Sequence, residues 1–158
     1  MAPIEFPIMV SYSQVAVFDH SLKCPFNEWT DRHVAQGFSW RPGSVAFRTI
    51  KEGGQHLVTV KVEVNEVELA PDVIRAIDVP FEVPSDGAVE IGSISDALSL
   101  ELPPGIYQLR FECYGCANNA NPRVRFLFCR NDNPVFRLVR ADSDLHPDKD
   151  LVLTALPA

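Results

Sequence analysis

The 158-residue sequence has no basic excess and no long apolar run. It carries 21 acidic residues against 14 basic ones, a formal net charge of −7. Proteins that bind duplex nucleic acid directly usually have a basic excess that meets the phosphates, so this balance argues against direct nucleic-acid binding. A transmembrane helix needs about 18 consecutive apolar residues, and the apolar runs here are shorter. The first ten residues lack the basic start and unbroken apolar core of a secretory signal, so we expect a cytoplasmic protein without a membrane span.

Assembled catalytic motifs are also missing. The sequence has no Gly-x-Ser-x-Gly elbow, no His-Glu-x-x-His pair and no glycine-rich phosphate loop that leads into a helix. Its 8 glycines are outnumbered by 13 prolines, which favours many short segments with stiff connections over long helices. We therefore expect a protein without enzymatic activity and without a cofactor.

Two groups of residues keep an alternative open, namely a β-sandwich that binds a small ligand or a metal. Cys113 and Cys116 have the spacing of a zinc knuckle, but a second knuckle is missing. The simpler interpretation is that Cys113 is a core residue and Cys116 lies in a loop. An acidic run near the C-terminus has oxygen ligands that suit calcium, although it lacks the glycine and final glutamate of an EF-hand; it consists of Asp142, Asp144, Asp148 and Asp150.

The dominant hydrophobic period is two, which is the period of a β-strand with one buried face. Residues 56–64 show it most clearly, and their four valines are predicted to point inward: Val58, Val60, Val62 and Val64. Residues 77–83 and 106–113 alternate in the same way, with the odd-numbered side chains predicted inward. Pro80 removes one ladder donor, which favours a sheet edge or a bulge for its strand.

Further short strands and one helix complete the expected fold. The remaining strands are predicted at 9–18, 44–50, 89–94, 99–102, 124–129, 135–140 and 151–155, and the turn Asn131–Pro134 is interpreted as a hairpin connection. Thr30 can cap a helix of about two turns over residues 30–36, which Gly37 ends. We expect this helix to dock through Trp29, Val34 and Phe38. The fold class is therefore mainly β: a single-domain antiparallel β-sandwich with one short α-helix.

Charge is segregated along the chain. Between Lys61 and Glu101 ten acids stand against two bases, whereas residues 123–140 carry five arginines and one acid. Exposed strand faces explain part of this pattern. The functional interpretation is an acidic surface that meets a basic protein partner.

Five segments in order resemble one protein family. They are Phe18, the helix start Glu28-Trp29-Thr30-Asp31, the run Gly43-Ser44-Val45-Ala46-Phe47, the strand Val79-Pro80-Phe81-Glu82-Val83, and the stretch from Leu98 to Leu109 with its Leu-Pro-Pro-Gly-Ile-Tyr-Gln-Leu sequence. Together they make the chain similar to the competence protein J family over roughly residues 10–115. Arg32 stands where the family pattern has glutamate, and residues 116–158 are not matched.

The resemblance implies a small inhibitor protein that binds a DNA-entry nuclease. An acidic protein suits this role, because a nuclease surface is built to receive phosphates. On this basis the predicted partner-binding residues are Glu28, Trp29, Asp31, Glu63 and Glu82. The expected partner is a nuclease with a basic surface.

Overall fold

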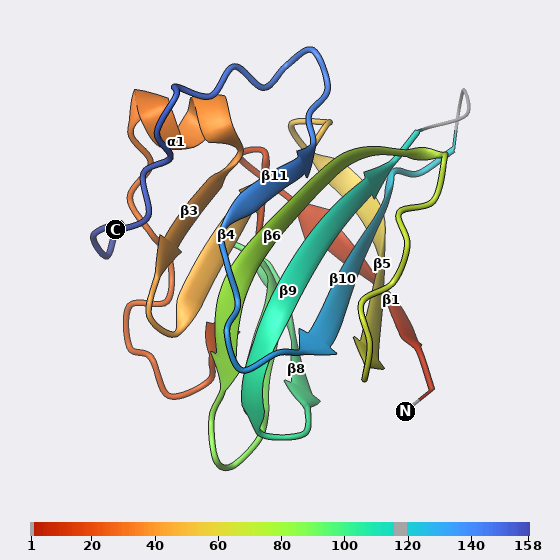
Figure 1. Ribbon diagram of the computed structural model, residues 1–158, viewed down its shortest axis with the longest axis vertical. Helices are drawn as coiled ribbons and strands as arrows, with labels where there is room; N and C mark the ends of the chain where they lie inside the picture. Colours follow the sequence, from red (N-terminus) through yellow and green to blue (C-terminus); the bar gives the residue numbers. More distant parts are fainter. Residues whose placement is uncertain (1, 116–119) are drawn as a thin grey trace.

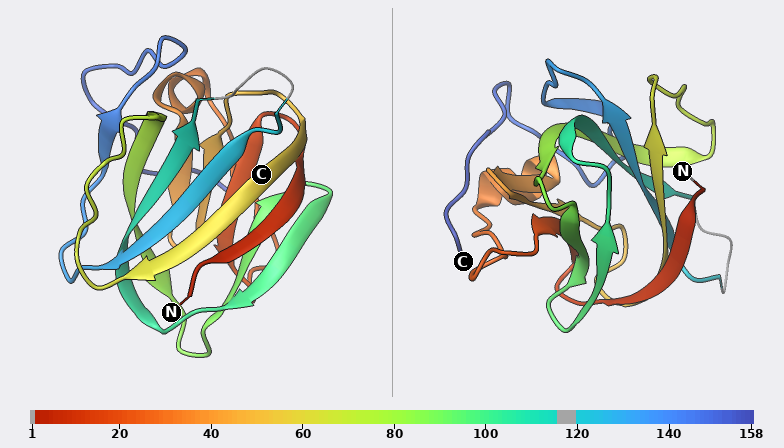
Figure 2. Two further views of the ribbon diagram at one scale, coloured as in Figure 1. Left: turned by 90° about the vertical axis from the view of Figure 1, so that its right-hand side faces the viewer. Right: turned by 90° about the horizontal axis from the view of Figure 1, so that it is seen from below.

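The computed structural model describes residues 2–115 and 120–158, which form two β-sheets and one short helix (Figure 1). The six-stranded sheet has the order β1 (Ile4–Val10), β5 (Gly54–Glu63), β10 (Arg123–Arg130), β9 (Gly105–Tyr114), β6 (Val73–Val83) and β11 (Arg137–Arg140). The five-stranded sheet has the order β3 (Phe38–Arg41), β4 (Ser44–Arg48), β2 (Gln14–Asp19), β7 (Ala88–Ser93) and β8 (Asp96–Glu101). Figure 2 shows the sheets facing each other as a sandwich, as the sequence predicts. The neighbouring strands pair antiparallel except β5 and β10, which run parallel.

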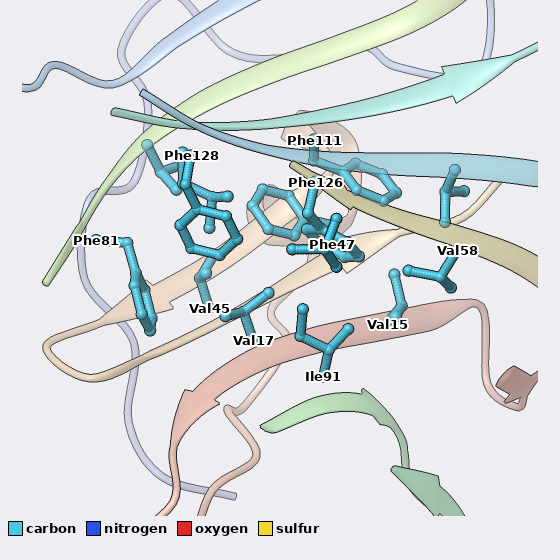
Figure 3. Close-up of a cluster of buried hydrophobic side chains, with 14 of the residues drawn as sticks. Val15, Val17, Val45, Phe47, Val58, Phe81, Ile91, Phe111, Phe126 and Phe128 are labelled. Atoms are coloured by element: carbon cyan, nitrogen blue, oxygen red, sulfur yellow. The ribbon is translucent and has the colours of Figure 1, made fainter. Parts of the chain in front are cut away.

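One hydrophobic core fills the space between the sheets (Figure 3). Phe111 of the six-stranded sheet stacks on Phe47 of the five-stranded sheet, with ring centroids 4.7 Å apart. The inward faces predicted for β6 and β9 are confirmed, because every predicted side chain is buried: Ile77, Val79, Phe81, Val83, Tyr107, Leu109, Phe111 and Cys113. Val58 and Val60 are buried as predicted, whereas the prediction for Val64 is wrong. Val64 lies beyond the end of β5 and is 78% exposed.

The single strand predicted over residues 9–18 is wrong, because the chain forms two strands there, one in each sheet. β1 starts at Ile4, and Tyr12 and Ser13 have φ of +55° and +56°, which turns the chain out of one sheet and into the other. Val10 to Ser13 alternate between apolar and polar side chains in the sequence, so a pattern of period two did not reveal the turn.

The predicted hairpin at Asn131–Pro134 is also wrong. β11 pairs with β6 and not with β10, so the connection crosses over the ends of β9 and β6. β6 is not an edge strand, but β11 pairs with it only from Ala76 to Asp78. Pro80 lies past this pairing, and its carbonyl accepts a hydrogen bond of 2.7 Å from the Trp40 indole. Pro80 therefore occupies a local edge.

Helix α1 (Asp31–Gln36) is confirmed with its predicted caps. Thr30 Oγ1 accepts from the His33 backbone N–H, His33 Nδ1 accepts from the Thr30 N–H, and Gly37 closes the helix at φ +88°. The prediction that the helix docks through Val34 is wrong, because the Val34 side chain is 40% exposed. The buried residues of the helix are His33 and Gln36. Among residues 2–115 and 120–158, the structure contains no helix of the length and apolarity that a membrane crossing requires.

Candidate partner-binding surface

The C-terminal segment, defined here as residues 145–158, runs along α1 (Figure 1, dark blue). The strand predicted at 151–155 does not form, so this prediction is wrong. Side chains of α1 hold this part of the chain in place of a β-ladder. Gln36 binds the backbone of Val152 in both directions, accepting from its N–H at 2.8 Å and donating to its carbonyl at 2.9 Å. His33 Nδ1 accepts from the Thr30 N–H, so Nε2 carries the ring hydrogen and donates to the Thr154 carbonyl at 2.9 Å.

Backbone hydrogen bonds extend this attachment beyond the helix. The Glu28 N–H donates to the Leu156 carbonyl at 2.8 Å, and the Ala158 N–H donates to the Phe26 carbonyl at 2.9 Å. The whole segment is therefore fixed against residues 26–36.

A groove of about 590 Å³ lies between these two parts of the chain. We call it the α1 groove, and it is lined by Glu28, Thr30, Asp31, Arg32, His33, Val152, Thr154, Ala155 and Leu156. Glu28 and Asp31 are exposed, and neither forms an ion pair within the described part of the chain. Arg32 pairs with Asp148 at 3.0 Å and donates to the Asp150 carbonyl at 2.8 Å. The α1 groove therefore has an acidic rim on one side and an apolar wall on the other.

Trp29 does not line the α1 groove, but its ring meets the ring of the groove residue His33 edge-on, with centroids 6.5 Å apart. Its side chain is half-buried, packs against the cluster of Phe18, Ala16 and Ala46, and donates from Nε1 to Gln14 Oε1 at 3.2 Å. Trp29 therefore anchors the segment that carries Glu28 and Asp31.

Glu63 and Glu82 lie elsewhere, on the outer face of the six-stranded sheet. Across the three neighbouring strands β10, β9 and β6, Glu63 is level with Cys129, Gln108 and Pro80. Glu82 follows Pro80 by two residues on β6, so both glutamates lie at the same end of the sheet. Glu63 pairs with Lys61 at 2.7 Å. Glu82 is exposed beside a small pocket of about 230 Å³ that includes Trp40 and Ile106. The structure thus brings the helix-start residues together and separates them from these two.

The outer face of the six-stranded sheet also holds a buried ionic network that the sequence analysis missed. Asp78 is fully buried and accepts from Arg110 Nε at 2.8 Å and from Arg137 Nε at 2.8 Å. Glu66 Oε1 contacts Arg137 Nη2 at 2.6 Å. Burial disfavours the charged form of Arg110, but the hydrogen bonds and charge of Asp78 outweigh this and raise the Arg110 pKa. One feature of the sequence could have indicated this network: Asp78 and Arg110 carry opposite charges at outward positions of two predicted strands, and these strands pair with Asp78 opposite Arg110.

Several arginines of residues 123–140 are engaged inside the protein rather than displayed. Arg125 pairs with buried Glu112 at 2.7 Å, and Arg140 donates to the carbonyls of Ala70 and Val73. Three of the five arginines in this stretch are exposed, namely Arg123, Arg130 and Arg137.

The described residues give little support to the metal-binding alternative. Cys113 is a buried residue of the inner face, as predicted, and Cys116 lies outside the described residues. Arg75 binds both carboxylate oxygens of Asp142, at 2.6 and 2.9 Å. Burial raises the Asp142 pKa, but the hydrogen bonds and charge of Arg75 outweigh it and lower this pKa. Within residues 2–115 and 120–158 no cluster of three or more His, Cys, Asp or Glu side chains is arranged to hold a metal ion.

Comparison with known proteins agrees with this fold. A curated relative, the "DNA-entry nuclease inhibitor" of Bacillus subtilis (strain 168), is 30% identical over 103 residues, which are 65% of this chain and 75% of that protein. A solved structure, the "Crystal structure of ComJ, inhibitor of the DNA degrading activity of NucA, from Bacillus subtilis", is similar with a TM-score of 0.68 and 23% identity, and the match covers 83% of this chain and 96% of that chain. The family model described as Competence protein J (ComJ) matches residues 7–129. Because this match covers most of the chain, including the helix and the central strands of both sheets, the chain belongs to the competence protein J (ComJ) family.

Proposed function

We propose that this protein is an inhibitor of a DNA-degrading nuclease, and that it acts by binding the nuclease rather than by catalysis. The observation that carries the proposal is the family match over residues 7–129 together with a relative, 30% identical, that is named as a DNA-entry nuclease inhibitor. The partner that follows is a nuclease whose DNA-binding surface is basic.

The distribution of exposed charge supports this partner. Seven of the 14 basic side chains are exposed against fourteen of the 21 acidic ones. The exposed basic residues are Lys23, Arg32, Lys51, Arg123, Arg130, Arg137 and Lys149. An acidic surface of this kind is attracted to a surface that normally receives phosphates, which raises the rate of association.

Among the predicted contact residues, Glu28 and Asp31 are the strongest candidates. Both are exposed beside the α1 groove, and their charge is not compensated by an ion pair within the described residues. Glu82 is the next candidate, because it is exposed at the rim of an apolar pocket. Glu63 contributes less because it pairs with Lys61, and Trp29 contributes mainly by holding Glu28 and Asp31 in place.

A cleavage assay tests the proposal. Purified protein is titrated into a DNA-entry nuclease, either that of Bacillus subtilis or one encoded beside the gene for this chain, and cleavage of plasmid DNA is followed at low salt. We expect inhibition and a complex that co-elutes in size-exclusion chromatography. The absence of both with every nuclease tested would contradict the proposed function.

A matched pair of charge reversals locates the contact. Asp31→Lys should weaken inhibition, because it places a cation at the α1 groove, whereas Asp132→Lys makes the same change at an exposed loop outside the family match. Equal inhibition by the two variants would place the contact away from α1. Thermal midpoints of both variants show whether the fold is retained.

A further inference from the structure

We propose that the C-terminal segment completes the nuclease-binding site by supplying one wall of the α1 groove. This inference rests on the proposed function. The occupant that we infer is a lysine or arginine side chain that projects from the basic face of the nuclease.

The first argument is the origin of the two walls. The family match ends at residue 129, so the wall that contains Glu28 and Asp31 lies within it. The opposite wall consists of Val152, Thr154, Ala155 and Leu156, all beyond the match. The acidic rim thus belongs to the matched part of the chain, whereas the shape of the groove depends on a segment outside it.

The second argument is that this wall is rigidly positioned. Both backbone groups of Val152 bind the Gln36 side chain, which is itself buried, and the Thr154 carbonyl accepts from buried His33. The Leu156 carbonyl accepts from the Glu28 N–H, which links the two walls directly. A wall fixed before binding loses little conformational entropy when a partner arrives.

The third argument is the chemistry of the groove. Lysine and arginine bury an aliphatic stem against apolar surface while the cation stays near water, and arginine is enriched among residues that dominate interface energies. Ala155 and Leu156 supply apolar surface for a stem, and Glu28 and Asp31 supply carboxylates for a cation. Arg32 also lines the groove, but Asp148 and the Asp150 carbonyl already bind its guanidinium.

Leu156 provides a sharp test because its side chain and backbone have separate roles. The side chain is 68% exposed and lines the groove, whereas the anchoring contact is made by the backbone carbonyl. Leu153 is a matched control, since it is 42% exposed, lies in the same segment and does not line the groove.

The experiment compares Leu156→Lys with Leu153→Lys in the plasmid-cleavage assay. Leu156→Lys should raise the concentration needed for half-inhibition by about tenfold, as expected for a central interface residue, while Leu153→Lys should match the wild type. Both variants should keep the wild-type thermal midpoint. If Leu156→Lys does not fold, Leu156→Gln replaces it, with the same expected direction.

Each outcome has a distinct meaning. Equal inhibition by wild type and Leu156→Lys would overturn the inference while the proposed function stands. An equal loss in Leu156→Lys and Leu153→Lys would also overturn it, because the effect would then reflect general charge and not the groove. A wild-type protein that fails to inhibit would instead overturn the proposed function itself.

Discussion

At the scale of single residues, Gly37 shows how one position fixes both the helix end and the core beneath it. Its φ of +88° is in the left-handed region, and its N–H donates to the His33 carbonyl. A Cβ at this position would lie 3.0 Å from Ile77 Cδ1 and 3.1 Å from Leu145 Cδ2. Both the backbone conformation and the surroundings therefore require glycine.

Gly37→Ala should lower the free energy of unfolding by about 1–2 kcal/mol from the backbone conformation alone, and further through the contact with Ile77. Gly43→Ala is the control, because Gly43 also has a positive φ, +81°, but its Cβ would meet its nearest neighbour at an ordinary 3.5 Å. Urea denaturation should show a larger loss for Gly37→Ala. Equal losses would mean that Ile77 and Leu145 adjust freely.

His56 is a second residue whose surroundings have a measurable consequence. It is fully buried, its Nδ1 pairs with the Gly54 carbonyl at 3.0 Å, and its Nε2 lacks a partner among the described residues. Burial lowers the pKa of His56 below 6.5, with a smaller contribution from Lys51, and the Gly54 hydrogen bond only partly opposes this. The folded protein therefore disfavours the charged imidazole.

This lowered pKa predicts a loss of stability in mild acid. The unfolded chain takes up the proton first, so the stabilisation is complete above about pH 6.5. It is lost as the pH falls towards the lower pKa of the folded state. The free energy of unfolding should thus be smaller at pH 5 than at pH 7.5, and His56→Leu should reduce that difference. His146→Leu, at an exposed position, is the control and should keep the wild-type difference between the two pH values. If His56→Leu also keeps that difference, the pH dependence of stability comes from other groups.

At the scale of elements, the outer face of the six-stranded sheet is held by ion pairs between strands. Asp78 of β6 binds Arg110 of β9 and Arg137 of β11, and Arg110 also donates to the Val67 carbonyl at 2.9 Å. One buried carboxylate therefore connects three strands and the segment that leads into β6. An alternating sequence pattern assigns such residues to the solvent-facing side, because it does not show that other segments cover this face.

Asp78→Asn should destabilise the protein by about 3–5 kcal/mol, because it removes the charge of the buried carboxylate that binds Arg110 at 2.8 Å. Glu66→Gln is the comparison, since Glu66 contacts the same arginines but its side chain is 68% exposed. For an exposed pair we expect a loss of about 0–1 kcal/mol. Chemical denaturation of both variants measures the difference, and similar losses would show that burial of Asp78 is not the deciding factor.

At the scale of the whole molecule, the two sheets are joined through one aromatic core. Phe111 is fully buried and contacts Phe47 and Phe126, with ring centroids 4.7 and 5.3 Å away. Because Phe47 belongs to the opposite sheet, the loss of Phe111 affects the packing of both layers.

Phe111→Ala should therefore cost about 3–5 kcal/mol of stability, the range for a large buried aromatic side chain. Ile106→Ala is the control on the same strand, since Ile106 is 43% exposed. Thermal unfolding followed by circular dichroism distinguishes them, and a near-neutral Phe111→Ala would be inconsistent with the observed packing.

The net charge of −7 leads to a prediction for the complex as a whole. Salt shortens the range of electrostatic attraction, from about 10 Å at 0.1 M to about 3 Å at 1 M. Inhibition of the nuclease should weaken as salt rises, mainly through slower association. Nuclease activity without inhibitor, measured at each salt concentration, is the reference. An inhibition constant that is independent of salt would mean that apolar contacts dominate.

The sequence alone determined the local features, because these depend on neighbours in the chain. The period of two specified the inward residues of β6 and β9, and Thr30 and Gly37 set the limits of α1. The ordered segments around Glu28 and Val79 indicated the family.

Which segments meet depends on the three-dimensional fold and could not be predicted from local sequence. The fold placed β11 beside β6, buried Asp78 with two arginines, and laid the C-terminal segment against α1 to form a groove beside Glu28 and Asp31. These contacts join residues far apart in the chain, and side-chain hydrogen bonds such as those of Gln36 leave no periodic pattern. The net charge could be counted from the sequence. Which charges are available to a partner depends on which arginines the fold buries or pairs internally.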